Sequence, residues 1–252
     1  MIRWVFLDVG NILLDEDPIA YHCTRLHWEA IRQIDPGLTF LDLLAAREDH
    51  SMRGSRWPLY DAVSAWLDEA ACGEVWNRAE QEIRSRFAEL SPVIPGAVEL
   101  VDRLAPQFRL GLIANQGTEC RRWLDALGLL RRFEIVALSE EVGSYKPEPE
   151  LYRGALRGAG VAPAQCVMIG DRLDNDIVPA AALGMATVWV RWSERSRKGW
   201  HCDDPDAIAF RASLQRSSTR SSDHRSGLRP SLVVEHLDAI DSARLVELAP
   251  QA

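Results

Sequence analysis

Short apolar runs alternate with amphipathic segments through the second half of the chain. The short runs predict strands, and apolar positions repeated every three or four residues predict helices between them. The predicted strands are 109–114, 134–138, 166–170, 187–191 and 232–234, and the predicted helices are 119–127, 148–158, 175–183 and 239–248. Strands that alternate with helices form parallel sheets through right-handed crossovers, so the pattern predicts a doubly wound, Rossmann-like α/β core.

A further strand, residues 4–7, lies far upstream of the others. Between it and residue 92, apolar positions recur at helical spacing: Ile19, Cys23, Leu26, Ala30 and Ile34 in one segment, Leu41, Leu44 and Ala45 in a second, and Val75, Ala79, Ile83 and Phe87 in a third. We therefore expect an all-helical cap domain, 15–91, inserted into a core made of 1–14 and 92–252. An insertion at this point can cover the active end of the sheet as a lid.

Residues 193–230 differ in composition from the rest of the core. They are rich in Ser and Arg and show little apolar periodicity. Such a composition predicts a mobile loop insertion within the core. Its local positive charge leaves a second interpretation open, in which the segment contacts a phosphate-rich partner or substrate.

The composition excludes several protein classes. The chain has 252 residues, 47% of them hydrophobic and 26% charged, with a net charge of -8, which argues against a nucleic-acid-binding protein. Five scattered cysteines without a CxxC pair favour a reducing cytoplasm over a disulfide framework or a zinc site. Asp8 interrupts the apolar N-terminal stretch, and no apolar run is long enough to span a membrane. The oligomeric state is not predicted.

Carboxylates follow two of the predicted strands. Asp8 comes directly after strand 4–7, and Asp171 and Asp176 follow strand 166–170. Neighbouring strand ends of a parallel sheet meet in one crevice, where two or three carboxylates repel one another unless protons or a cation neutralise them. A cluster of oxygen ligands favours a hard ion, and Mg²⁺ is the usual one where phosphate also binds. Asp8 also has a simpler interpretation as a turn or helix-capping residue, and Asp176 as a charge at a helix N-terminus, whereas Asp171 follows a buried strand directly after a glycine.

Lys146 is one of only two lysines in the chain and the only one in the predicted folded core. Pro147 follows it and precedes a predicted helix, which fixes the lysine just before the helix begins. A compact cation at this place can balance both a carboxylate nucleophile and a phosphate group.

Four stretches, taken together, resemble the motifs of the haloacid dehalogenase superfamily, in particular its members with an inserted helical cap of the C1 type. They are Leu7–Leu13, Leu110–Asn115, Lys146–Pro147 with Tyr152, and Gly170–Asp171 with Asp176. They occur in the family's order, and the resemblance covers nearly the whole chain. It is specific for the fold and less specific for the substrate.

The resemblance implies a Mg²⁺-dependent phosphatase that acts on a small phosphorylated metabolite. Asp8 would be the nucleophile and would form an aspartyl-phosphate. Mg²⁺ would bind Asp8, the carbonyl of Gly10 and Asp171, with Asp176 supporting the metal and Lys146 orienting Asp8. The phosphate would contact the loops at Gly10 and Asn11 and at Ala114 and Asn115, together with Lys146.

Two positions depart from the family pattern. The phosphatases usually carry a second aspartate, the general acid, two residues after the nucleophile, and here that residue is Gly10. The hydroxyl residue that binds phosphate is replaced by Ala114. Loss of a general acid typically costs about 10²- to 10⁴-fold in rate, and less when the leaving group is good. We therefore expect either a preference for good leaving groups or an acid from elsewhere, the candidates being Asp15, Glu16, Asp17, His22 and His27.

Three other functions stay open to different degrees. A metal-free 2-haloacid dehalogenase tolerates a non-acid at position 10 but has no use for the pair Asp171 and Asp176. A non-catalytic or weakly active binding protein is favoured by Gly10 and Ala114, and retention of Asp8 argues against it. A phosphonate hydrolase needs a lysine in the cap, and the predicted cap contains none.

Overall fold

The computed structural model describes residues 1–55, 57–192, 199–200, 202–220 and 229–248. It divides into two compact units. The first comprises 1–15, 92–199 and 224–252, and the second comprises 16–91 and 200–223. The two units are described separately.

The first unit is built on a six-stranded parallel sheet. Its strands are β1 (Trp4–Leu7), β2 (Arg109–Ala114), β3 (Ile135–Leu138), β4 (Cys166–Gly170), β5 (Ala186–Val190) and β6 (Leu232–Val234), in the order β3-β2-β1-β4-β5-β6. The predicted Rossmann-like core is confirmed. The direction of the strand order changes at β1, so the carboxyl ends of β1 and its neighbours β2 and β4 form the edge where doubly wound folds place their sites.

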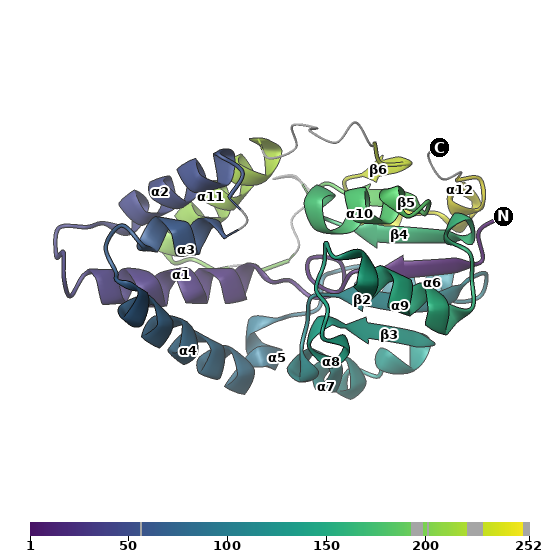
Figure 1. Cartoon of the computed structure of the whole chain (residues 1–252), viewed down its shortest axis with the longest axis horizontal. Helices are drawn as coiled ribbons and strands as arrows, with labels where there is room; N and C mark the ends of the chain where they lie inside the picture. Colours follow the sequence, from purple (N-terminus) through teal and green to yellow (C-terminus); the bar gives the residue numbers. More distant parts are fainter. Residues whose placement is uncertain (56, 193–198, 201, 221–228, 249–252) are drawn as a thin grey trace. The chain divides into compact units, whose positions relative to one another are not determined.

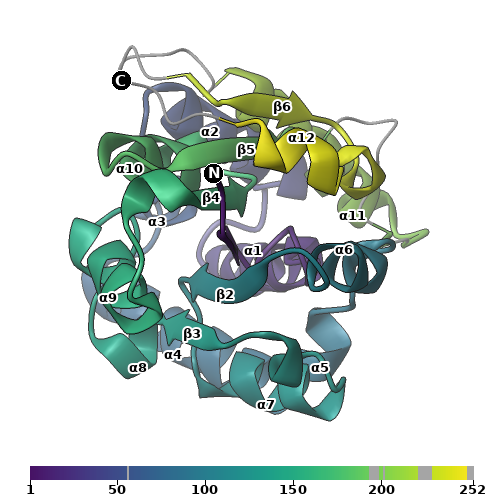
Figure 2. The ribbon, with the colours of Figure 1, turned by 90° about the vertical axis from the view of Figure 1, so that its right-hand side faces the viewer.

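Helices cover both faces of this sheet (Figure 2). Helices α9 (Pro149–Ala159) and α10 (Val178–Ala182) lie on one face, and α6 (Ala97–Leu104), α7 (Thr118–Ala126) and α12 (Ser242–Val246) lie on the other. A short helix, α8 (Ser139–Val142), follows β3. All residues of β1 and β4 are buried, and Trp4 and Phe6 of β1 pack in the same apolar cluster as Leu151 and Tyr152 of α9. Helix α9 therefore packs directly against the central strand β1.

The second unit is helical. It contains α1 (Asp17–Ile31), α2 (Phe40–Met52), α3 (Pro58–Val63), α4 (Glu69–Ser85), α5 (Phe87–Leu90) and α11 (Pro205–Arg220), shown in Figure 1. Helix α1 packs against α4, and α2 packs against α3 and α11. Cys23, Leu43, Val63 and Ala79 belong to its main apolar cluster. No helix of the described residues is both long and apolar enough to cross a membrane.

Helix α11 differs from the loop expected over 193–230. Residues 205–220 form a helix of the second unit, whereas residues 193–198, 201 and 221–228 of the expected loop lie outside the described residues. The buried face of α11 carries Ala207, Phe210, Ser213 and Ser217, and Phe210 packs on Phe40 and Leu44 of α2. Two of these four buried residues are serines. The helix therefore buries residues at helical spacing, although the apolar residues of its sequence show only a weak helical periodicity.

Candidate active site

Asp8 directly follows β1 and is nearly buried, with 7% of its surface exposed. Its main-chain N–H donates to the carbonyl of Ile169 in β4 at 2.9 Å, and its Oδ1 accepts the N–H of Val9 at 2.8 Å. The carbonyl of Val9 accepts the N–H groups of Leu13 and Leu14 at 2.8 and 3.0 Å, which closes a compact turn. The carboxylate is thus held by a strand end and a tight loop, as a preorganised reactive group must be.

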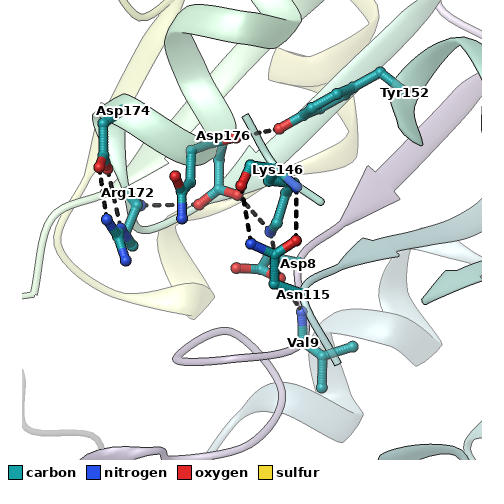
Figure 3. A network of polar contacts seen from close by, with 9 residues as sticks. Asp8, Val9, Asn115, Lys146, Tyr152, Arg172, Asp174 and Asp176 are labelled. Atoms are coloured by element: carbon teal, nitrogen blue, oxygen red, sulfur yellow. Dashed lines mark hydrogen bonds and ion pairs between the residues drawn. The ribbon is translucent and has the colours of Figure 1, made fainter. Parts of the chain in front are cut away.

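Lys146 bridges two aspartates, as Figure 3 shows. Its Nζ lies 2.7 Å from Asp8 Oδ1 and 2.6 Å from Asp176 Oδ1, and its side chain is only 2% exposed. Burial alone would lower the pKa of Lys146, but the two carboxylates outweigh burial and raise it, so the lysine stays an ammonium ion.

Asp176 is fully buried in a π-helical turn, Leu173–Ile177, that follows β4. While its Oδ1 faces Lys146, its Oδ2 accepts the N–H of Arg172 at 2.9 Å. Tyr152 of α9 donates its hydroxyl hydrogen bond to the carbonyl of Asn175 and so ties the same turn to a core helix. Both oxygens of Asp176 therefore already accept hydrogen bonds from the protein. This arrangement suits a carboxylate that positions neighbouring groups of the site better than one with unoccupied oxygens.

Asp8, Asp171 and Asp176 form one acidic cluster, with ligand atoms that all lie within 4.8 Å of one another. Burial raises the pKa of Asp8 well above its usual range; Lys146 opposes this shift, and the other two carboxylates add to it. Lys146 pairs with two of the three carboxylates, those of Asp8 and Asp176. The oxygen-only composition of the cluster fits a hard divalent cation, whose charge would oppose the rise in the pKa of Asp8.

The loops that were predicted to contact phosphate have distinct environments. Ala114 is buried at the end of β2, and the side chain of the exposed Asn115 hydrogen-bonds to the main chain of Lys146. Gly10 is buried and bridges to Leu14, and its φ does not lie in the left-handed region, whereas Asn11 has a φ of 56°.

The comparisons with known proteins place the chain in a family. Its sequence matches the haloacid dehalogenase-like hydrolase family over residues 2–184. The chain belongs to this family of hydrolases. It is 36% identical over 205 residues to a glyceraldehyde 3-phosphate phosphatase of Methanothermobacter thermautotrophicus, covering 75% of this chain and 86% of that protein. It is 39% identical over 112 residues to the enzyme of that name from Methanopyrus kandleri, covering 42% of this chain and 46% of that protein.

The fold of this hydrolase also occurs in a solved structure, the HAD phosphatase from Thermococcus onnurineus. That structure superimposes with a TM-score of 0.61 at 19% sequence identity and covers 99% of this chain and 100% of its own. This likeness shows the fold, and the family match over residues 2–184 confirms the family membership expected from the four motifs.

Two tryptophans of the hydrolase were not predicted to belong to the site. The indole N–H of Trp189 in β5 donates to the carbonyl of Asp171 at 2.8 Å, and that of Trp192 donates to the carbonyl of Asn11 at 2.8 Å. Arg172 pairs with the exposed Asp174 at 2.6 Å and was also missed. A tryptophan within an apolar strand is interpreted from the sequence as a core residue. Whether its indole N–H donates to a main-chain carbonyl depends on which loop lies beside it in the tertiary structure.

Proposed function

We propose that this hydrolase is a Mg²⁺-dependent phosphatase that acts on a small phosphorylated metabolite through an aspartyl-phosphate on Asp8. The observation that carries the proposal is the arrangement of Asp8, which contacts the ammonium of Lys146 and belongs to an oxygen-only acidic cluster with Asp171 and Asp176. Phosphatase relatives of 36% identity support the reaction class. Their substrate is not transferred to this chain, because fold and motifs leave it open.

In the proposed first step, a carboxylate oxygen of Asp8 attacks phosphorus and the bond from phosphorus to the leaving-group oxygen breaks. In the second step, water attacks the same phosphorus, which releases inorganic phosphate and restores the carboxylate. Lys146 holds Asp8 in place and offsets charge on the transferring phosphoryl group. Asp8, the carbonyl of Gly10 and Asp171 would hold Mg²⁺, which neutralises charge on the phosphoryl oxygens.

Gly10 provides no proton for the leaving group, so the enzyme should favour leaving groups that depart without one. Of the acids considered from the sequence, His27 is fully buried within the helical unit, with Nδ1 2.7 Å from the carbonyl of Cys23, and it cannot reach a substrate. His22 lies 2.8 Å from Glu82 in the same unit. We further propose that the helical unit serves as the cap, as the sequence suggests.

The test is a substrate panel with and without Mg²⁺. We expect hydrolysis of acyl and aryl phosphates, slower hydrolysis of sugar phosphates, and loss of turnover in Asp8→Asn or in excess EDTA. A dehalogenase, which Gly10 alone would favour, should release chloride from 2-chloropropionate in EDTA and leave every phosphate ester intact.

A further inference from the structure

The side chain of Asn115 hydrogen-bonds to the main chain of Lys146 through both its oxygen and its nitrogen (Figure 3). The N–H of Lys146 donates to Asn115 Oδ1 at 2.7 Å, and Asn115 Nδ2 donates to the carbonyl of Lys146 at 3.1 Å. A main-chain N–H only donates and a main-chain carbonyl only accepts, so these partners fix the orientation of the carboxamide. The side chain therefore holds Lys146 on both sides of its Cα.

The segment that carries Lys146 is a turn in which the N–H of Glu148 donates to the carbonyl of Tyr145 at 2.7 Å and the hydroxyl of Ser144 donates to Glu148 Oε2 at 3.2 Å. Residues 143–148, between α8 and α9, form no regular secondary structure. Within the described part of the chain, no backbone group hydrogen-bonds to the N–H or the carbonyl of Lys146. The far end of the same residue is placed tightly, 2.7 Å from Asp8 and 2.6 Å from Asp176.

We propose that Asn115 is a positioning residue, whose carboxamide fixes the main chain of Lys146 and thereby holds the ammonium between Asp8 and Asp176. The effect on turnover rests on the proposed phosphatase function, but the effect on the lysine does not. Direct phosphate binding by the Asn115 side chain is the competing role, and the two roles differ in what is lost when the carboxamide is removed.

The first test observes the lysine itself. The chain contains only two lysines, so protein labelled with ¹³C at the lysine ε-carbon gives two signals, and Lys198→Arg assigns them. In Asn115→Ala, the Lys146 signal should move toward the position of a solvent-exposed lysine while the Lys198 signal stays. Asn77→Ala, which removes a carboxamide from an exposed position of α4, is the matched control. An unchanged Lys146 signal in Asn115→Ala overturns the proposal.

The second test is a double-mutant cycle with Lys146→Met on the hydrolysis of an aryl phosphate. Displacing a catalytic group by about 1 Å can cost about 10²-fold, so Asn115→Ala should lower kcat by about 10- to 100-fold. KM should change much less than kcat, since Lys146 acts mainly on the charge of the transferring phosphoryl group. In the Lys146→Met background, Asn115→Ala should have little further effect, because both changes act on the same group.

Additive losses, or a loss confined to KM, would show that Asn115 binds substrate directly and would overturn the positioning role. Asn115→Asp keeps an acceptor for the Lys146 N–H and removes the donor, so a partial displacement of the lysine signal is expected. If the wild-type protein hydrolyses no phosphate at all, the proposed function fails, and the lysine spectra still decide the role of Asn115.

Discussion

The side chain of Asp176 occupies the space that any side chain on Gly170 would need. A Cβ at position 170 would lie 2.3 Å from the Cβ of Asp176 and 2.5 Å from its Oδ2. Gly170 is the last residue of β4, so the main chain of a central strand packs directly against the buried side chain of Asp176. This contact explains a glycine at a strand end by close approach, without any special backbone angle.

Gly170→Ala should therefore damage both stability and activity. The added methyl group must displace Asp176 and with it Lys146, and overpacking of this kind costs about 1–3 kcal/mol. Thermal unfolding and turnover are measured together. Gly154→Ala is the control, because a Cβ at this half-exposed position of α9 has only Arg157 near it, at 4.0 Å, and it should stabilise the helix by about 0.5–1 kcal/mol. Equal melting temperatures for the two variants would contradict the packing argument.

Removal of one carboxylate from the acidic cluster should weaken Mg²⁺ binding. Asp171→Asn takes away a charged oxygen ligand, and we expect the Mg²⁺ concentration for half-maximal activity to rise at least about tenfold. Asp174→Asn serves as the comparison, since Asp174 is exposed and pairs with Arg172 outside the cluster. Calorimetric titration with Mg²⁺ gives the same quantity without turnover. Full activity of the wild type in excess EDTA would rule out the metal-dependent reaction.

The rate should fall steeply as the pKa of the leaving group rises. Gly10 cannot protonate an alkoxide, whereas a carboxylate or phenolate departs largely unassisted, and a general acid is typically worth about 10²- to 10⁴-fold. Gly10→Asp should flatten this dependence. The φ of Gly10 lies outside the left-handed region, so backbone strain does not oppose the substitution. Equal wild-type rates for aryl and alkyl phosphates would mean that another group already donates the proton.

The helical unit should lose stability in mild acid. Burial lowers the pKa of His27, whose carbonyl partner on Cys23 only partly opposes this. Below about pH 6.5 the unfolded chain takes up a proton on this histidine, whereas the folded chain does not. The free energy of unfolding therefore decreases as the pH falls through that value, by at most about 1.4 kcal/mol per pH unit. Calorimetry should show a smaller acid-induced drop for His27→Gln than for His236→Gln at an exposed site. An identical drop in both variants would exclude His27 as the cause.

The sheet could be predicted from the sequence because each of its strands combines a short apolar run with a clear break. The predicted strand 166–170 coincides with β4, and Asp8 and Asp171 follow buried strands whose ends the parallel topology brings together. Strand periodicity and topology thus carry most of the information that assembles the acidic cluster.

Other features depend on contacts that periodicity does not encode. Ile34 and Leu41 fit apolar helical faces in the sequence, yet they are 64% and 61% exposed. The buried face of α11 is half serine, and the side chain of Asn115 reaches main-chain groups 31 residues away. The burial and the hydrogen-bond partners of these residues are set by the tertiary structure, so the residue types alone do not predict them.

The aspartyl-phosphate itself is the most direct test of the proposed function. Wild-type protein mixed with Mg²⁺ and an aryl phosphate is quenched in acid within the first turnovers, and the peptide that contains Asp8 is analysed by mass spectrometry with and without borohydride reduction. We predict the added mass of one phosphoryl group on Asp8, its conversion by borohydride to the reduced side chain, and its absence from Asp8→Asn. Release of phosphate without label on Asp8, or label on another residue, would contradict the account.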